Sequence, residues 1–507
     1  MNEDINIDEL AELVDIPEEY HGLALEESMP KLVEDWTNAV VSVSKKNDIP
    51  ATTSFFVILG QITKDFVRIP RGENTEDSRI HFCWMQTSGS GKSTLWNFVH
   101  KVNDEVNEKI NLFEGTNIIE EPDVYIPNRY DLFDIIDYTD AALIGFYEKI
   151  DNPELEEYRA LSYEDREDTP QPEKYIFERR SGALEGNGLA HWDEFEYSGI
   201  FKQGQHKENA VVYMNTFMNT LEGDACVITK KLKEGHIMEC RCERSVWAST
   251  YIPRHLQKVI TSNGVLQRML IYVREVPEEE IDEMNLETIA LSGIRINTEK
   301  DVSKFSNALF RLYTDVKAEF IQNGSDPFST IKYSAGFAEA LVNEYKKMRD
   351  YIKSCHPEIR KVVRTFITRM NVQLLKLSVL CCIANSPSVK DPTKKFIVTP
   401  THVRQAYILT QQCYITLVEW LEQSLKVHNS VLTQAKSSIF VDKYTEMINE
   451  GEGNDGFISK PKLFARVQVS GVSRAQCYRD WKHAEKKFTL DTKGRSVFVK
   501  LKGDEKK

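Results

Sequence analysis

The stretch HFCWMQTSGSGKSTLWNFV, from His81 to Val99, decides how the rest of the chain is interpreted. Its apolar beginning predicts a short buried strand, and the helical spacing of apolar residues resumes from Lys92. Between the two lies a turn that is rich in glycine and serine and ends in a lysine and a serine. A strand, such a turn and a helix together form the pattern of a phosphate-binding loop.

In a phosphate-binding loop, backbone amides converge on the phosphates, the lysine neutralises their charge and the next hydroxyl binds magnesium. The sequence therefore predicts ATP and Mg²⁺ as ligands. The residues expected at the nucleotide are Gly89, Ser90, Gly91, Lys92, Ser93 and Thr94. Gln86 replaces the usual first glycine, at a position that shapes the turn without an essential phosphate contact, so we expect the site to function. The alternative is a serine- and glycine-rich turn with a lysine that binds no nucleotide.

A phosphate-binding loop needs a second carboxylate site, at the end of another apolar strand, to hold magnesium and position water. The segment GLAHWDEFE, residues 188–196, supplies such a site. We expect Asp193 to bind the magnesium ion together with Ser93, and Glu194 to orient or deprotonate the attacking water. Adjacent acids on a solvated surface are the alternative, but the preceding apolar run favours catalysis.

Short strands alternate with helices after the loop, which predicts an α/β fold with a parallel sheet. The pattern is helical at 1–78, mixed at 79–300 and helical again at 301–426. Within the mixed region, residues 151–174 contain nine acidic residues and predict a mobile inserted loop. Residues 437–507 read as three helices and a hairpin, the order of a winged helix.

Charge is segregated along the chain, which has 507 residues and a net charge of −14. Residues 456–507 hold 14 Lys and Arg against 5 Asp and Glu, a net of +9, which leaves −23 for the preceding part. An acidic body thus ends in a basic tail. The acidic start is no signal peptide and the apolar runs are too short to span a bilayer, so we expect no membrane association and a cytoplasmic protein.

The nine cysteines are scattered, which suits a reducing compartment better than a disulfide framework. His236, Cys240 and Cys242 come nearest to a metal-binding pattern, but a fourth ligand at the usual zinc spacing is absent. Ordinary strand residues are the favoured interpretation of these three.

Several segments resemble, in order, parts of the minichromosome-maintenance-type AAA+ helicases. GLAHWDEFE resembles their acidic strand, VITKKLKEGHIMECRCERSVWAST their hairpin and first sensor strand, and NGVLQRMLIYV their arginine-bearing segment. The helical VRTFITRMNVQLLKLSVL and VTPTHVRQAYIL follow in the same order, so the resemblance covers roughly residues 79–500. IIDYTDAALIGFY also resembles phage and mobile-element ATPases linked to primase-helicases. The resemblance implies an AAA+ P-loop core, a helical lid, a C-terminal winged helix and a homo-oligomeric ring, expected to be a hexamer.

The resemblance also implies roles for further residues. The sensor asparagine of the family is absent, which leaves Thr250, or alternatively Ser249, as the polar group near the γ-phosphate. Arg268 matches the arginine finger that reaches the ATP of a neighbouring subunit, and an arginine that only caps the strand or pairs with an acidic residue is the alternative. Arg364 resembles the sensor arginine of the lid, although Arg369 competes for that role and a solvated helix face is the alternative.

Two groups of basic residues are implied to contact DNA. In a ring, Lys230, Lys231 and Lys233 would point into the pore from a hairpin and grip the phosphates of single-stranded DNA, with a solvated hairpin tip as the alternative. Duplex DNA is expected to contact one face of the third winged-helix helix, unless that face only aids solubility. The residues of this face are Arg474, Arg479 and Lys482.

Taken together, these features predict an ATP-driven, ring-forming DNA helicase or translocase, the replicative helicase of a phage, plasmid or other mobile element. A switch ATPase that binds an origin or loads a helicase is one alternative, and a non-catalytic AAA+ scaffold in an assembly or defence complex is another. The hairpin lysines and Arg268 favour the motor, whereas the missing sensor asparagine favours the other two. Primer synthesis would need a separate primase.

Overall fold

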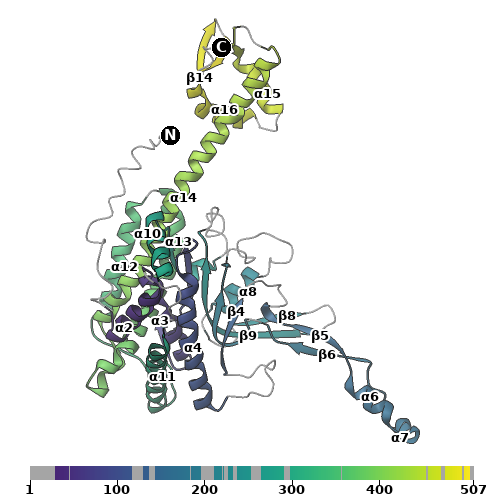
Figure 1. Ribbon diagram of the computed structural model, residues 1–507, viewed down its shortest axis with the longest axis vertical. Coiled ribbons are helices and arrows are strands. Elements are labelled where there is room, and N and C mark those ends of the chain that lie inside the picture. The colour runs from purple at the N-terminus through teal and green to yellow at the C-terminus, as the bar shows by residue number, and fades with distance from the viewer. Residues whose placement is uncertain are drawn as a thin grey trace. The chain divides into compact units, whose positions relative to one another are not determined.

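Two compact units, Met1–Trp420 and Leu421–Lys507, make up the chain in a computed structural model (Figure 1). The structure describes residues 29–44, 46–116, 129–135, 143–182, 184–195, 210–219, 221, 226–231, 237–252, 264–290, 297–355, 357–452, 455–469, 474–493 and 496–502. The boundary between the units falls inside helix α14 (Pro400–Asn449), earlier than the predicted break at 426–437. The predicted boundaries at 78 and 300 do not divide unit 1.

A mainly parallel six-stranded sheet forms the centre of unit 1. Its parallel strands lie in the order β10-β3-β9-β7-β4, and β8 pairs antiparallel with the first half of β9. Their bounds are β3 Phe82–Gln86, β4 Tyr130–Ile135, β7 Gly186–Trp192, β8 Val227–Lys231, β9 Ile237–Thr250 and β10 Leu270–Arg274. Strands β3 and β7 are buried throughout, as strands covered on both faces must be. The predicted α/β fold with a parallel sheet is confirmed.

Helices pack around this sheet, and the predicted N-terminal helical region belongs to the same core. Helix α3 (Asp48–Thr63) is apolar on all sides and buried along nearly its whole length. Trp36, on α2 (Lys31–Val43), packs edge-on against three phenylalanines, one from each of three helices, with ring centroids 5.3–5.7 Å apart. Those helices are α3, α4 (Lys92–Glu114) and α11 (Glu299–Gln322), so residues 29–63 are part of the body that holds the sheet.

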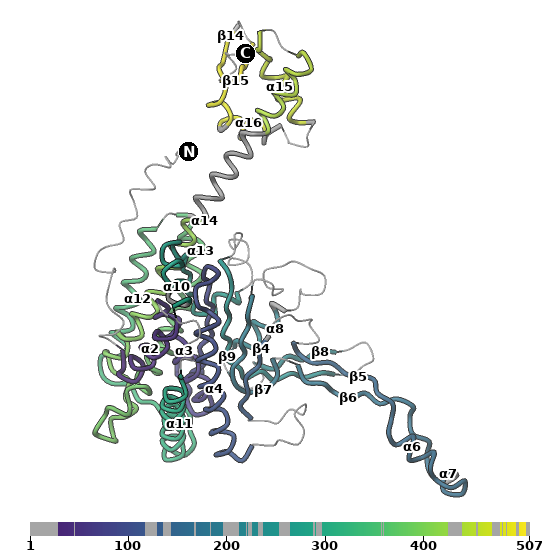
Figure 2. Tube along the Cα trace, in the orientation of Figure 1, coloured from purple at the N-terminus to yellow at the C-terminus, as the bar shows by residue number. Residues whose placement is uncertain are grey.

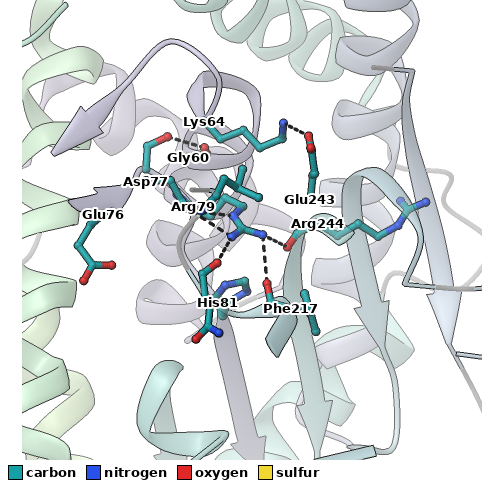
Figure 3. A network of polar contacts seen from close by, with 12 residues as sticks. Gly60, Lys64, Glu76, Asp77, Arg79, His81, Phe217, Glu243 and Arg244 are labelled. Atoms are coloured by element: carbon teal, nitrogen blue, oxygen red, sulfur yellow. Dashed lines mark hydrogen bonds and ion pairs between the residues drawn. The ribbon is translucent and has the colours of Figure 1, made fainter. Parts of the chain in front are cut away.

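Between α3 and β3 the chain forms a hairpin of β1 (Arg68–Arg71) and β2 (Asn74–Asp77) that the helical prediction for residues 1–78 missed. A buried polar network follows it (Figure 3). The Arg79 guanidinium donates to Asp77 Oδ2 over 2.9 Å and to the carbonyls of Arg244 and Asn219 over 3.2 and 2.6 Å. Lys376 Nζ lies 3.6 Å from Asp77 Oδ1. Burial disfavours the charged carboxylate, but Arg79 and Lys376 hold the pKa of Asp77 well below its ordinary value.

Replacing Asp77 by asparagine is expected to lower the free energy of unfolding by about 3–5 kcal/mol, because it leaves the Arg79 charge buried without its partner. Since the pKa of Asp77 is lowered on folding, the stability it contributes is present above its unfolded pKa and is lost as pH falls through the folded pKa. Chemical unfolding as a function of pH measures both effects. Asp350→Asn is the matched control, because the Asp350 carboxylate is paired with Lys353 at the surface, and we expect little change. Equal losses in the two variants would contradict the importance of burial.

The predicted loop at 151–174 is instead the tip of a structured arm, which corrects that expectation. Strands β5 (Phe146–Asp151) and β6 (Tyr175–Arg180) pair antiparallel, and helices α6 (Pro153–Ala160) and α7 (Tyr163–Asp168) lie between them. The arm projects away from the central sheet (Figures 1 and 2). Asn152 and Ser162 cap the two helices, accepting from the amides of Glu154 and Asp165, which explains helix formation in so acidic a segment.

The region after β10 is helical, as predicted. Its helices are α10 Glu278–Ala290, α11, α12 Phe337–Ser354, α13 Pro357–Asn385 and α14, and a short parallel pair is formed by β11 Lys332–Tyr333 and β12 Ile397–Val398. Helix α14 begins at Pro400, as the sequence indicates. By length and composition, one segment among the described residues, Ile359–Ser388, could cross a membrane. It is 83% buried inside the protein, as a core helix is.

Unit 2 has its own hydrophobic core, built by the end of α14 and the elements after it. Phe440, Phe464, Trp481 and Phe488 meet there, with ring centroids 5.3–5.5 Å apart. The elements are β13 Ile458–Ser459, α15 Lys460–Val469, α16 Arg474–Ala484, β14 Phe488–Lys493 and β15 Ser496–Leu501, with an antiparallel sheet in the order β13-β15-β14. The predicted succession of three helices and a hairpin is therefore present.

Candidate functional site

The phosphate-loop pattern lies between the end of β3 and the start of α4, as the sequence predicts. Gly89 and Gly91 have φ angles of 75° and 79°, in the left-handed region that only glycine adopts without cost. A Cβ atom on Gly91 would also come within 2.9 Å of Ser44 Oγ. Gln86 is not among the residues with positive φ, so the backbone there does not require the glycine of the usual pattern. The turn ends at the N-terminus of a 23-residue helix, where anions are stabilised.

Lys92 reaches back across the loop. Its Nζ donates to the carbonyls of Gln86 and Thr87 over 2.6 and 3.2 Å and lies 4.8 Å from the centre of the Tyr251 ring. The ammonium is thus held over the loop by neutral groups, with no carboxylate among these three partners. A phosphate group bound at the loop would add a stronger, charged partner for the same ammonium.

The acidic pair follows β7 directly. Ser249 Oγ donates to Asp193 Oδ1 over 2.8 Å, and the amide of Glu194 donates to the same oxygen over 3.0 Å. Glu194 has φ 49°, a left-handed conformation that is costly for a residue with a side chain and typical of functional sites. Both acidic residues are exposed, so each can contact a ligand.

A cavity of about 400 Å³ brings these groups together. The predicted site residues that line this cavity are the loop from Gly89 to Thr94, the acidic pair and Thr250. Magnesium prefers hard oxygen ligands and keeps several of its waters. The hydroxyl of Ser93 and the carboxylate of Asp193 face the same cavity, so this donor set fits the ion.

Two further walls of the cavity were missed by sequence reasoning. Ser42, Val43 and Ser44, at the end of α2, line one side, and Met284 and Asn285 of α10 line another. Neither segment carries a motif, because each is brought to the loop by the fold. Val43 and Met284 supply apolar surface, which suits the flat base of a nucleotide.

Ion pairs fasten α10 to the turn between α2 and α3. Lys46 Nζ lies 2.5 Å from Glu283 Oε2, and Arg274 forms a bidentate pair with Glu280 at 2.8 Å. Arg274 also donates to the carbonyl of Lys46 over 2.8 Å. Lys46 has φ 61°, so the turn is held in a conformation that a lysine rarely adopts.

A second cavity, of about 500 Å³, adjoins the first and shares Lys92, Ser93 and Asp193 with it. His191 stacks on Trp96 with ring centroids 3.8 Å apart, and its Nδ1 lies 2.7 Å from Asp134 Oδ1. This hydrogen bond lowers the pKa of Asp134. The position of Asp134 at the carboxyl end of β4 was the signal in the sequence that could have predicted this polar wall.

The two possible sensor residues line different cavities. Thr250 lines the first cavity, whereas Ser249 lines the second and contacts Asp193. Sequence reasoning preferred Thr250, and the position of that residue agrees with contact to a nucleotide. Ser249 acts on the site through Asp193 instead.

Arg268 lies at the opposite end of the strands from the phosphate loop. It belongs to the short 3-10 turn Leu266–Arg268 that precedes β10, whereas the loop follows the carboxyl end of the parallel neighbour β3. Its Nη1 donates to Asn215 Oδ1 over 2.8 Å and to the carbonyl of Gly264 over 3.0 Å. Burial and the nearby Arg369 charge lower its pKa. Arg268 therefore makes hydrogen bonds within its own chain, as an arginine with a structural role would.

The two arginines considered for the lid sensor lie on α13. Arg364 is exposed and Arg369 is half-buried, and neither lines the cavity at the phosphate loop. The charge of Arg369 instead acts on Arg268.

The residues predicted to contact DNA are described only in part. Lys231 is exposed at the end of β8, and Lys230 is half-buried with its Nζ 5.9 Å from the Tyr213 ring centre. Lys233 lies outside the described residues. The predicted hairpin is present as the β8 and β9 pair. On α16, Lys482 is exposed, and the side chains of Arg474 and Arg479 lie outside the described part.

Two of the three residues that come nearest to a metal-binding pattern, Cys240 and Cys242, belong to the described part of the chain. Cys240 and Cys242 are buried on β9, and burial raises the pKa of both, that of Cys242 to about 12. His236 lies outside the described residues. No group of three or more metal-ligating side chains is found in the described part of the chain.

Comparison of the sequence with the models of known protein families and with characterised proteins finds no match. The function is therefore argued from the site itself.

Proposed function

We propose that this chain is an ATP-driven DNA translocase of the AAA+ type that works as a ring of identical subunits. The observation that carries the proposal is the 400 Å³ cavity in which the loop Gly89–Thr94, Asp193, Glu194 and Thr250 converge. A triphosphate needs amides and a lysine at its phosphates, oxygen ligands for magnesium and a carboxylate for the attacking water. All of these groups line this one cavity.

The side chains divide the chemistry among them. Lys92 would exchange its carbonyl partners for the phosphates, and Ser93 and Asp193 would hold magnesium. When bound, magnesium supplies neutralisation of the charge on the β- and γ-phosphates. Glu194, whose backbone is left-handed, would orient or deprotonate water. Thr250 would stand at the γ-phosphate in place of the sensor asparagine.

A ring is supported by the position of Arg268. Because it lies at the far end of the strands from its own phosphate loop, it can serve only a nucleotide that another copy binds. Arg369, close to Arg268, and Arg364, on the same helix, would act from the same side. Six copies is the number that the resemblance implies.

The remaining parts of the chain would handle DNA. Helices α11 to α14 would form the lid, and unit 2 would be a winged helix whose helix α16 contacts duplex DNA. The basic tail supports this assignment, because a net charge of +9 over 52 residues attracts phosphates. Lys230, Lys231 and Lys233 would grip single-stranded DNA in the pore. The cytoplasm supplies the ATP, and a separate primase would supply primers.

A switch ATPase is the second candidate function. It is favoured by the bond between Ser249 and Asp193, because this bond takes up an oxygen of the carboxylate that magnesium requires. An ATPase in which this hydroxyl must first be displaced would turn over slowly. The rate of hydrolysis with and without DNA distinguishes the switch from the motor.

DNA-stimulated ATP hydrolysis tests the proposal. We expect single-stranded DNA to raise turnover in the wild-type protein, and the triple replacement of Lys230, Lys231 and Lys233 by alanine to remove this rise and leave basal hydrolysis. The matched control is the triple alanine replacement of the exposed lysines of α12, which changes the net charge equally. Its residues are Lys346, Lys347 and Lys353. Turnover that ignores DNA would favour the switch, and normal stimulation of the triple hairpin variant would exclude these lysines.

A further inference from the structure

Gln86, which stands where a phosphate loop usually has its first glycine, is engaged in a chain of hydrogen bonds. Its side chain is fully buried. The carboxamide oxygen accepts from Trp84 Nε1 over 2.5 Å, and the carboxamide nitrogen donates to Asn47 Oδ1 over 2.9 Å. Its backbone carbonyl accepts from Lys92. A residue that only shaped the turn would need none of these contacts, so the sequence-based interpretation of Gln86 is incomplete.

Asn47 links Gln86 to the phosphate loop by hydrogen bonds. It is 1% exposed, and its Nδ2 donates to the carbonyl of Ser90 and to Ser44 Oγ, each over 2.9 Å. Ser44 Oγ in turn donates to the carbonyl of Gly91 over 2.9 Å. Two consecutive carbonyls of the loop are thus held by the turn between α2 and α3.

The hydrogen bonds that hold these two carbonyls also fix the direction of the backbone amides of Gly91 and Lys92. In a trans peptide the C=O and N–H groups point in opposite directions, and the described residues contain no cis peptide. When the carbonyls of Ser90 and Gly91 face the α2–α3 turn, the amides of Gly91 and Lys92 must face away from it. Converging amides are what a phosphate loop offers to its ligand.

We propose that Gln86 and Asn47 are positioning residues that hold the phosphate loop in the conformation that receives a nucleoside triphosphate. This inference rests on the proposed function of the same site. The side chain of Gln86, at the position where the usual glycine is missing, hydrogen-bonds to Asn47. Asn47 in turn hydrogen-bonds to the phosphate loop, so the two residues together support the loop. Nucleotide affinity therefore depends on Asn47, which lies 45 positions before Lys92 in a segment that carries no nucleotide motif.

The chain contains a matched pair for comparison. Gln61 Nε2 donates to Asn187 Oδ1 over 3.0 Å, which repeats the glutamine–asparagine bond of Gln86 and Asn47 in another part of the core. Both glutamines are buried, and Gln61 also donates to the carbonyl of Glu243. Removal of either bond should cost stability, but only one of the two pairs is connected to the phosphate loop.

Titration of full-length variants with a fluorescent ATP analogue and Mg²⁺ tests the inference. Asn47→Asp has the shape of asparagine and keeps an acceptor for Gln86, but it cannot donate to the Ser90 carbonyl. Gln86→Glu cannot donate to Asn47. We expect each to raise the Kd at least about tenfold. The double variant Asn47→Ala/Gln86→Ala, which brings no carboxylates together, should raise it no further than the weaker-binding of its two single alanine variants, because the two residues act in series. Gln61→Ala should lose stability and keep its Kd within about twofold.

The outcomes separate this inference from the proposed function. If the wild-type protein binds the analogue and Asn47→Asp binds it equally well, with circular dichroism showing both folded, the positioning role is wrong and the nucleotide site stands. If Gln61→Ala weakens binding as much as Gln86→Glu, the effect is one of general stability and the inference is also wrong. If the wild-type protein binds no nucleotide, both the proposed function and the inference are wrong.

Discussion

Replacing Lys92 by alanine is expected to abolish ATP hydrolysis, with a fall in turnover of at least about a thousandfold. The ammonium already lies over the loop, where it donates to the carbonyls of Gln86 and Thr87, and it is the group that would offset charge on the transferring phosphoryl group. Release of inorganic phosphate by the purified protein, with and without DNA, measures the effect. Lys304→Ala is the control, because Lys304 is an exposed lysine on α11. Normal turnover in the Lys92 variant would refute the site.

Variants of the two acidic residues, Asp193 and Glu194, should have different defects in ATP binding and hydrolysis. Asp193→Ala is expected to abolish hydrolysis because a magnesium ligand is removed. Glu194→Gln keeps the size of the side chain and removes only its charge, so the variant should bind ATP, hydrolyse almost none and retain the assembled state. Nucleotide binding and phosphate release, measured on the same preparations, separate these defects. If Glu194→Gln hydrolyses ATP normally, another group must activate the water.

Replacing Arg268 by alanine should leave ATP binding intact and remove nearly all hydrolysis, because a subunit would lose the charge that its neighbour supplies to the transition state. The defect should be shared between subunits. Mixing this variant with Lys92→Ala, each inactive alone, would place an intact pocket beside an intact arginine at some interfaces. Partial hydrolysis should then return. Arg311→Ala, which changes an exposed arginine on α11, serves as the control.

Subunit exchange must be shown first, by a pull-down of differently labelled variants. If mixed rings form and remain inactive, there are two explanations. Either Arg268 does not act across the interface, or an isolated complete site in the ring cannot hydrolyse ATP. Near-normal turnover of Arg268→Ala alone leaves only the first explanation. The bonds from Arg268 to Asn215 and Gly264 would then describe its whole role.

Local patterns predicted the parts of the site that each lie on one continuous segment. The loop from Gly89 to Thr94 and the acidic pair Asp193 and Glu194 follow buried strands, and parallel strands bring their carboxyl ends to one edge of a sheet. The alternation of strands and helices predicted that sheet.

The rest of the site depends on contacts between distant segments. Ser44 and Met284 reach the phosphate loop from residues about 50 before and 190 after it, and no short pattern records such a contact. Gln86 was interpreted from its place in a motif, whereas its role is set by Asn47, which only the packing of α3 brings near. Residues 151–174 were mistaken for a loop because their composition is acidic, although the helix caps there were visible in the sequence.

The arm has a consequence for how this protein can change. Phe146 and Arg180 are cross-strand partners, so the chain leaves the core and returns to it at neighbouring points. The base of the arm contacts the sheet, because Arg179 donates to the carbonyl of Glu239 on β9, whereas the tip between Asp151 and Tyr175 is a cassette whose length can change without shifting the register of the central sheet. Evolution can lengthen, shorten or exchange this cassette while the strands that carry the acidic pair and the phosphate loop keep their places. The surface of this cassette can therefore change without moving the strands that carry the acidic pair and the phosphate loop.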